Sequence, residues 1–312
     1  MTPPLPLFPD ETSATLSPHP HQIEARDRIL VARAAGRWGF LLGDRTGLGK
    51  TLAAWLALAA MPEREVLIVC PRGAIPHWRR TIALSGAGAG KDVTILNYER
   101  TKSLLAPVAA SAKRSTRAKN NELAKHGAPK RVYPLVLFDE AHRLRNPYAQ
   151  QTMACRAMAD AARFRLFLSA TAGQTPHELG YLGPLLGQVA GVDTSSLAGF
   201  RELMKRLGIG RAKGRWVNWR WEPNEADRDR ISRLLYTGGP ASAIGIRRRP
   251  EDIAGWPEVQ RALSPTALDA KERRLYDATW REFRRELGLL GGSVRRPIGW
   301  AADLRFRQKG SL

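Results

Sequence analysis

The chain has 312 residues, of which 43% are hydrophobic and 25% are charged. This is an ordinary globular composition, and the length predicts about two domains. Fifty lysines and arginines stand against 29 aspartates and glutamates, which gives a formal net charge of +21. A surface this basic favours a polyanionic partner, and nucleic acid is the first candidate.

Membrane-spanning and disulfide-stabilised proteins do not fit the sequence. The longest apolar run, residues 51–61, is too short to cross a bilayer, so we expect no membrane partner. The N-terminus has no basic start followed by an apolar core, so it is not a secretory signal. Cys70 and Cys155 lie in unrelated settings without metal-type spacing. We expect a cytoplasmic protein, encoded by a bacterium or a phage.

The first part of the chain alternates between helical and strand patterns. Residues 1–20 are Pro-rich and we expect them to be a disordered tail, before a helix that starts at His21. Asn146 and Pro147 are suited to cap and begin a helix that runs to Ala162. Short apolar runs predict strands at 38–42, 66–70, 93–96, 135–138 and 165–169. Such strands, separated by helices, predict an α/β fold with a parallel sheet covered on both faces.

After the tail at residues 1–20, the pattern predicts three further regions along the chain. Residues 21–190 would form one lobe, interrupted at 106–131 by a basic insertion whose charges are most simply those of a solvated loop. Residues 191–262 would form a helical, basic and Trp-rich protrusion that belongs to this lobe. Residues 263–312 would be a linker, dominated by one charged helix at 269–290. The second half is therefore a mainly helical C-terminal extension.

A glycine-rich loop follows the first predicted strand. Residues 44–51 read Asp-Arg-Thr-Gly-Leu-Gly-Lys-Thr. The backbone N–H groups of such a loop can surround phosphate oxygens. Lys50 would add a positive charge on the β- and γ-phosphates, and the Thr51 hydroxyl would bind Mg²⁺. A chance match is the alternative, but the strand before the loop and the helix after it argue for a phosphate site.

A pair of carboxylates follows the fourth predicted strand, in the tetrapeptide Asp-Glu-Ala-His at 139–142. Asp139 would serve the metal and Glu140 the attacking water of a phosphoryl transfer. A solvated acidic pair is the plainer interpretation. However, ligands of parallel sheets bind at the carboxyl ends of the strands, where both motifs lie. The two motifs therefore predict a nucleoside triphosphate site.

Taken together, the motifs resemble those of the first RecA-like ATPase lobe of Swi/Snf-type proteins in helicase superfamily two. The glycine-rich loop is similar to that family's Asp-Glu-Met-Gly-Leu-Gly-Lys-Thr, including Asp44. Residues 69–78 resemble motif Ia of that family, and residues 96–99 resemble motif Ib. Residues 139–142 resemble motif II in its DEAH form, and residues 169–171 resemble motif III. Residues 246–276 resemble the segment that joins the two lobes. The resemblance covers roughly residues 20–310.

This resemblance implies ATP hydrolysis coupled to movement along duplex DNA, with ATP and Mg²⁺ as cofactors. The implied catalytic residues are Lys50, Asp139 and Glu140. The implied ATP-binding residues are Gln22, which would recognise adenine, and Asp44, Gly47, Leu48, Gly49, Lys50 and Thr51. Thr51 and Asp139 would hold Mg²⁺. The residues that would couple hydrolysis to movement are His142, Ser169 and Thr171. The residues that would contact DNA are Arg72, Asn97 and Tyr98.

A second candidate DNA-binding stretch combines cations with aromatic side chains. Its residues are Arg211, Lys213, Arg215, Trp216, Trp219 and Arg220. Such mixtures are typical of nucleic-acid surfaces. The alternation of Trp219 and Trp221 is equally consistent with one packed face of a hairpin, so both interpretations stand.

Motors of this family have a second RecA-like lobe, which supplies arginines to the γ-phosphate. After Leu263 the sequence predicts one helix and a short tail, whereas each strand–helix–strand unit needs roughly 30 residues. We expect a second lobe on a separate polypeptide, or its loss by truncation. We also expect this chain alone to bind ATP but hydrolyse it slowly, because a missing arginine finger costs about 10³–10⁵ in turnover. The alternatives are a non-catalytic DNA-binding module and the motor subunit of a restriction system.

Overall fold

The computed structural model of the chain describes residues 15–106, 128–173, 175–194, 196–209, 211–213, 218–220, 225–237, 243–257 and 268–289. The chain divides into two units, Met1–Pro257 and Glu258–Leu312. Most of the predicted tail and most of the basic insertion lie outside the described residues. The predicted start of the linker, residue 263, lies close to the boundary between the units.

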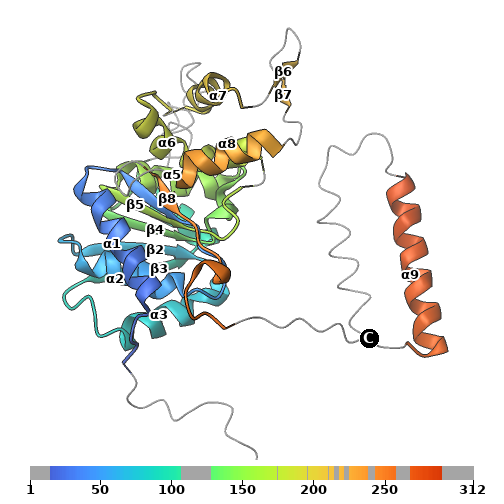
Figure 1. Ribbon diagram of the computed structural model, residues 1–312, viewed down its shortest axis with the longest axis horizontal. Coiled ribbons are helices and arrows are strands. Elements are labelled where there is room, and N and C mark those ends of the chain that lie inside the picture. The colour runs from blue at the N-terminus through green and yellow to red at the C-terminus, as the bar shows by residue number, and fades with distance from the viewer. Residues whose placement is uncertain are drawn as a thin grey trace, which may run out of the picture. The chain divides into compact units, whose positions relative to one another are not determined.

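A six-stranded sheet forms the centre of the first unit (Figure 1). Its order is β3-β2-β4-β5-β1-β8, and every neighbouring pair is parallel. The strands are β1 Gly39–Leu42, β2 Glu65–Cys70, β3 Asp92–Asn97, β4 Leu135–Asp139, β5 Phe164–Leu168 and β8 Gly245–Ile246. The five predicted strands are confirmed to within one residue at each end. The predicted α/β class is also confirmed.

Helices cover both faces of this sheet, which gives two hydrophobic cores. The helices of one face are α1 Pro20–Ala34, α2 Lys50–Ala60 and α3 Ile75–Leu84, and those of the other are α5 Gln150–Ala161, α6 Gly183–Ala190, α7 Leu197–Arg206 and α8 Glu225–Tyr236. Phe40 and Leu42 lie in the first core, and Leu41 between them lies in the second. Successive side chains of a strand point to opposite faces, so both faces of β1 are buried.

The helix predicted from Asn146 begins later, at Gln150. The side chain of Asn146 accepts a hydrogen bond from the Tyr148 N–H at 3.0 Å, and its carbonyl accepts one from the Ala149 N–H at 3.2 Å. Asparagine commonly bonds its own backbone two residues on, which closes a turn. This turn takes the place of the first helical turn that the sequence suggested.

Strand β8 has no counterpart among the predicted strands, and it adds Gly245 and Ile246 to the sheet of the lobe. The Leu41 N–H donates to the Ile244 carbonyl at 2.8 Å, and the Gly43 N–H donates to the Ile246 carbonyl at 2.7 Å. Helix α7 adds Phe200 to the core under the sheet. The region predicted as a protrusion is therefore partly built into the lobe.

The remaining elements are short, except for α9. Strands β6 Arg211–Lys213 and β7 Asn218–Arg220 pair antiparallel, with Trp219 opposite Ala212, so these residues do form a hairpin. Arg215, Trp216 and Trp221 lie outside the described residues. The 3₁₀ segments used below are η1 Arg72–Ala74, η2 Tyr98–Leu104, η4 Ala141–Leu144, η5 Pro176–Leu182 and η6 Pro250–Asp252. The second unit contains α9 Ala270–Leu289, as predicted.

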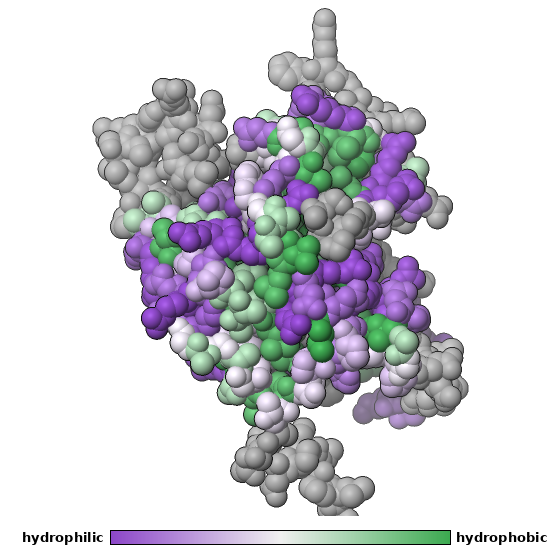
Figure 2. Space-filling model, turned by 60° about the vertical axis from the view of Figure 1, so that its left-hand side comes forward, coloured by the Kyte–Doolittle hydropathy of each residue, from purple (hydrophilic) through white to green (hydrophobic). Residues whose placement is uncertain are grey.

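The surface is mixed in character. Figure 2 shows hydrophilic side chains over much of one face, with hydrophobic ones in an irregular band between them. None of the helices in the described part of the chain is long and apolar enough to cross a membrane.

Candidate nucleotide and DNA site

The glycine-rich loop joins the end of β1 to the start of α2. Gly47 has φ of 95° and Gly49 has φ of 69°, in the left-handed region that glycine adopts without strain. A Cβ atom on Gly49 would lie 1.9 Å from the Gln22 Nε2 atom, so the backbone must pass very close to that side chain. Helix α2 begins at Lys50, directly after the loop. A helix N-terminus behind such a loop is a ready anion site.

Gln22 lies against this loop. Its Nε2 lies 3.4 Å from the carbonyl oxygens of both Leu48 and Gly49, and its Oε1 accepts the His19 N–H at 2.9 Å. The neighbouring His21 places Nε2 at 3.0 Å from the Leu48 carbonyl. The first turn of α1 is therefore tied to the loop through two side chains.

Lys50 lies between the loop and the carboxylates of motif II. Its Nζ donates to the carbonyls of Asp44 at 2.8 Å and Arg45 at 3.2 Å. Burial lowers the pKa of Lys50, and the nearby charges of Glu140, Asp44 and Asp139 act in the opposite direction. The ammonium group is thus within electrostatic reach of both motif II carboxylates, although β5 separates β1 from β4.

The sequence placed Asp44 among the ATP-binding residues. In the structure the carboxylate of Asp44 is bound by Arg248. The carboxylate is 2% exposed and is bound by Arg248, with Nη2 at 2.5 Å, Nε at 3.2 Å and the backbone N–H at 2.9 Å. Arg248 Nη1 also donates to the His21 carbonyl at 2.7 Å and to Glu24 Oε2 at 2.9 Å. Arg248 therefore joins α1, the loop and β8.

Only a weak signal for Arg248 is present in the sequence. It stands in the basic run 247–249, within the part of the chain that resembles the segment between lobes. Of these three arginines only Arg248 is buried. Its partner Asp44 is the residue that distinguishes the loop from the generic phosphate-loop pattern. An acid at an unusual loop position, together with a distant basic run, is the signal that could have found this pair.

A large cavity opens beside His21. It has a volume of about 730 Å³, and its lining includes His19, His21, Arg248 and Trp256. The rings of His21 and Trp256 meet edge to face at 5.5 Å. Ligand sites of proteins are typically about 300–1,000 Å³ with aromatic walls and a few polar groups. The volume and lining of this cavity fall within that range.

Asp139 ends β4, and both of its carboxylate oxygens have donors. Oδ2 accepts the Trp78 indole N–H at 2.8 Å, and Oδ1 accepts the Glu140 N–H at 3.0 Å. Burial raises the pKa of Asp139, against the effect of the Trp78 bond. Thr51 lies in the first turn of α2, half-buried.

The donor set fits Mg²⁺. Among the described residues there is no group of three or more His, Cys, Asp or Glu side chains that would enclose a metal. Mg²⁺ is usually bound through one or two carboxylates together with substrate phosphates and water, not by a cage of protein ligands. Asp139 and Thr51 can supply that number of oxygens.

Glu140 has a strained backbone and a bonded side chain. Its φ of 52° and ψ of 50° are left-handed, and it is the one non-glycine residue with positive φ in the described part of the chain. This conformation costs about 1–2 kcal/mol. Glu140 Oε2 lies 3.1 Å from His142 Nδ1, and this bond is the main reason that the pKa of Glu140 is lowered.

The three predicted coupling residues, His142, Ser169 and Thr171, lie next to one another beside Glu140. His142 Nδ1 is 3.3 Å from the Ser169 hydroxyl oxygen, which also accepts the Thr171 N–H at 3.2 Å. Ser169 is fully buried at the end of β5. A continuous set of contacts therefore runs from Glu140 to Thr171.

The predicted DNA-contact residues have different environments. Arg72 is exposed directly after β2, and Asn97 ends β3, where it is the register partner of Cys70. Tyr98 is fully buried, and its hydroxyl donates to the Asp139 carbonyl at 2.6 Å. The prediction that Tyr98 contacts DNA is therefore wrong for its side chain in this conformation. Arg211, Lys213, Trp219 and Arg220 lie on the β6–β7 hairpin.

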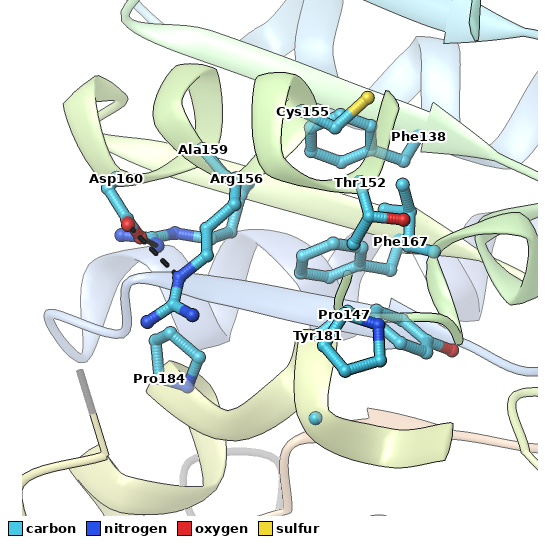
Figure 3. A pocket seen from close by; sticks show the side chains of 13 residues that line it. Phe138, Pro147, Thr152, Cys155, Arg156, Ala159, Asp160, Phe167, Tyr181 and Pro184 are labelled. Atoms are coloured by element: carbon cyan, nitrogen blue, oxygen red, sulfur yellow. Dashed lines mark hydrogen bonds and ion pairs between the residues drawn. The ribbon is translucent and has the colours of Figure 1, made fainter. Parts of the chain in front are cut away.

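A second pocket lies behind motif II, between α5 and the segment η5–α6 (Figure 3). The aromatic side chains of Phe138, Phe167 and Tyr181 line it, and its volume is about 30 Å³. This is room for roughly one or two waters, not for a nucleotide.

Comparison with known families gives one match. Residues 15–174, just over half of the chain, match the family described as "Type III restriction enzyme, res subunit". The matched region includes the glycine-rich loop and motifs II and III. A search of the curated proteins found no match.

The fold also resembles solved structures. One is the SWI2/SNF2 ATPase core of Sulfolobus solfataricus in complex with dsDNA, at 17% identity and a TM-score of 0.51, with 95% of this chain and 58% of that chain covered. Another is the same organism's SWI2/SNF2 ATPase core domain, at 17% identity and a TM-score of 0.47, with 96% and 59% covered. The chain thus spans less than two thirds of these proteins. The first match confirms the RecA-like fold predicted for the lobe.

Proposed function

The chain belongs to the family of the type III restriction enzyme res subunit, and from this membership we propose that it is the ATP-binding motor lobe of a DNA translocase or helicase. One observation carries the proposal. Lys50 begins α2 after the loop that follows β1, and Asp139 and Glu140 lie at the end of β4, yet their charges interact at the carboxyl edge of one sheet. An ammonium group and two carboxylates behind a glycine-rich loop are the parts needed to bind and hydrolyse a nucleoside triphosphate.

We propose the following roles, which the geometry supports. The loop amides and Lys50 would bind the phosphates, and Thr51 and Asp139 would hold Mg²⁺, which offsets negative charge on the phosphate oxygens when bound. Glu140 would orient and polarise the attacking water. Its lowered pKa keeps it ionised near neutral pH, as an acceptor of hydrogen bonds from water must be.

The base of the nucleotide would enter the cavity beside His21. The rings of His21 and Trp256 offer apolar contact there. Gln22, the next residue of α1, has an amide that can pair with a base edge. Adenine recognition by Gln22 would require its amide to exchange the long 3.4 Å contacts with the loop for contacts with the base.

DNA would bind along the carboxyl edge of the sheet, through Arg72 and Asn97, and at the β6–β7 hairpin. Two observations support this: Arg72 is exposed, and β6 and β7 carry Arg211, Lys213 and Arg220. A duplex is the partner we propose, together with a second RecA-like lobe that supplies arginines to the γ-phosphate. The purified chain alone is then expected to bind ATP and to hydrolyse it slowly.

Nucleotide binding tests the proposal directly. We expect wild type to bind a fluorescent ATP analogue with Mg²⁺, and Lys50→Ala to bind roughly tenfold to hundredfold more weakly. A hydrogen bond to a charged group contributes about 1.5–3 kcal/mol, and 1.4 kcal/mol is tenfold in affinity. Lys271→Ala, on exposed α9, is the matched control and should bind as wild type does. Equal affinity of Lys50→Ala and wild type would refute the site and favour a non-catalytic DNA-binding module.

The family membership favours a second candidate, the motor subunit of a restriction system whose nuclease lies on another chain. Cells that express this chain with its neighbouring genes should then take up unmodified plasmid less efficiently than cells with the Lys50→Ala variant. Equal transformation of the two strains would leave the general translocase as the better proposal.

A further inference from the structure

Two buried aromatic residues hold Asp139 from two different directions. Trp78 lies on α3 and donates its indole N–H to Asp139 Oδ2 at 2.8 Å. Tyr98 begins η2 and donates its hydroxyl to the Asp139 main-chain carbonyl at 2.6 Å. Both side chains are fully buried. Together with the Glu140 N–H on Oδ1 at 3.0 Å, they fix the position and the plane of the carboxylate.

The same two segments carry the proposed DNA contacts. Arg72 is exposed in η1, which leads directly into α3, and Arg79 is exposed on α3 beside Trp78. Asn97 is half-buried and immediately precedes Tyr98. Each segment therefore has an exposed side chain or surface and one buried side chain that donates a hydrogen bond to Asp139.

A packed helix transmits small movements because protein interiors have little free volume. A shift of α3 by a fraction of an ångström would change the 2.8 Å indole bond and rotate the carboxylate. A hydrogen bond weakens steeply as its geometry departs from linear. Asp139 is thus connected mechanically to the surface on which the phosphate backbone would lie.

We infer that Trp78 and Tyr98 are positioning residues that couple DNA contact at the ends of β2 and β3 to the orientation of the metal-binding carboxylate of Asp139. This inference rests on the proposed function. It adds two residues that touch neither nucleotide nor DNA, and it gives the buried Tyr98 a role that direct DNA contact does not.

The chain offers a matched control for Trp78. Trp55 on α2 is also fully buried, lies in the same core and donates its indole N–H to a side-chain oxygen, that of Ser85, at 2.9 Å. Trp55→Phe removes the same atoms from the same core as Trp78→Phe. Only Trp78→Phe removes a bond to Asp139. A general loss of stability affects both variants, whereas a loss of coupling affects one.

The experiment measures binding linkage in the full chain. The dissociation constant of a non-hydrolysable ATP analogue is determined with Mg²⁺, and separately with EDTA, in the absence and presence of saturating duplex DNA. The ratio of the two constants with Mg²⁺ is the coupling factor, which for linked sites is typically about 5–150-fold. We expect a coupling factor in this range for wild type and for Trp55→Phe. For Trp78→Phe we expect a coupling factor of about one. Affinity with EDTA should be the same in all variants.

Tyr98→Phe provides a second variant that loses only a hydroxyl and keeps its ring. We expect it to reduce the coupling factor severalfold. Equal coupling in Trp78→Phe and Trp55→Phe, or wild-type coupling in Tyr98→Phe, would overturn the inference and leave the proposed function in place. A wild-type chain that binds nucleotide and DNA without any linkage would do the same. Failure of wild type to bind Mg²⁺ and nucleotide at all would overturn both.

Discussion

The imidazole Nδ1 of His142 lies 3.3 Å from the hydroxyl oxygen of Ser169, and this contact joins motif II to motif III. His142 lies in η4, directly after the two carboxylates, and Ser169 follows β5, the strand between β1 and β4. The hydroxyl of Ser169 also accepts the Thr171 N–H. A change at Glu140 can therefore reach the turn after β5 through hydrogen bonds.

Replacing Ser169 tests this connection. Ser169→Ala should leave the affinity for nucleotide within about twofold, because the hydroxyl bonds motif II and its own turn, not the glycine-rich loop. Hydrolysis in a single turnover, with excess protein and duplex DNA, should fall by up to about tenfold, since one hydrogen bond contributes about 0.5–1.5 kcal/mol. Ser103→Ala, whose exposed hydroxyl bonds the Arg100 carbonyl, is the control. A wild-type rate in Ser169→Ala would mean that the contact is only structural.

The Arg248–Asp44 ion pair predicts a large effect on stability. Arg248→Ala leaves a buried carboxylate without its partner, and breaking such a pair costs about 3–5 kcal/mol in the free energy of unfolding. Arg249→Ala, its exposed neighbour, should change that free energy by no more than about 0.5 kcal/mol. Urea unfolding measures both. The double variant with Asp44→Ala should lose less than the sum of the single losses, and additivity would contradict the pairing.

The hydroxyl of Thr152 predicts a gain in stability. It is buried beside the small apolar pocket of Figure 3, and it has no hydrogen-bond partner among the described residues. Thr152→Val removes the unsatisfied group at nearly constant volume, and should raise the free energy of unfolding by about 1 kcal/mol. Thr101→Val should lower it by a similar amount, because the buried Thr101 hydroxyl donates to the Tyr98 carbonyl at 2.7 Å. Changes of the same sign would contradict this account.

Cys155 makes stability depend on alkaline pH. Burial raises the pKa of this thiol from 9.0 to about 12. The folded state therefore holds the thiol proton over a range of pH in which the unfolded state releases it. Its contribution is fully present below about pH 9 and is lost as the pH rises towards about 12. Cys155→Ala should flatten the fall of the unfolding free energy between about pH 9 and 11. Rapid alkylation of native Cys155 at mildly alkaline pH would show that the thiol is not buried.

The β6–β7 hairpin predicts a change in the salt dependence of DNA binding. Charge reversal at Arg211, Lys213, Arg215 and Arg220 should flatten the log–log slope of affinity against salt by about 0.9 for each phosphate that the variant no longer neutralises. Arg64→Glu, which precedes β2 at the amino edge of the sheet, should leave the slope unchanged. An unaltered slope after reversal in the hairpin would remove it from the interface.

The elements that the sequence predicted well are those with a strong local signal. Strands such as β2 and β4 are continuous apolar runs, and the glycines of the loop set its backbone conformation whatever surrounds it. The approach of Lys50 to Asp139 could also be expected, because parallel strands bring their carboxyl ends to one edge. Local pattern and topology were enough for the centre of the site.

The features that the sequence did not reveal depend on contacts between distant residues. Strand β8 has two residues and exists because β1 offers unpaired backbone groups. Arg248 and Asp44 are separated by 204 positions, and the sequence around each residue does not indicate which residue it pairs with. Tyr98 resembled a surface residue of motif Ib, but its ring is buried in the core against the end of β4. Whether a single side chain is buried depends on the tertiary packing around it, which the local sequence does not determine.

Strand β8 also bears on how this protein can be divided for experiments. A fragment cut at residue 190, where the alternation of strands and helices stops, would expose β1 as a bare edge and remove Arg248, the ion-pair partner of Asp44. Uncovered edges promote association between molecules. The smallest soluble fragment that retains the loop should therefore extend to Pro257. A boundary chosen from the sequence motifs alone would lie earlier in the chain.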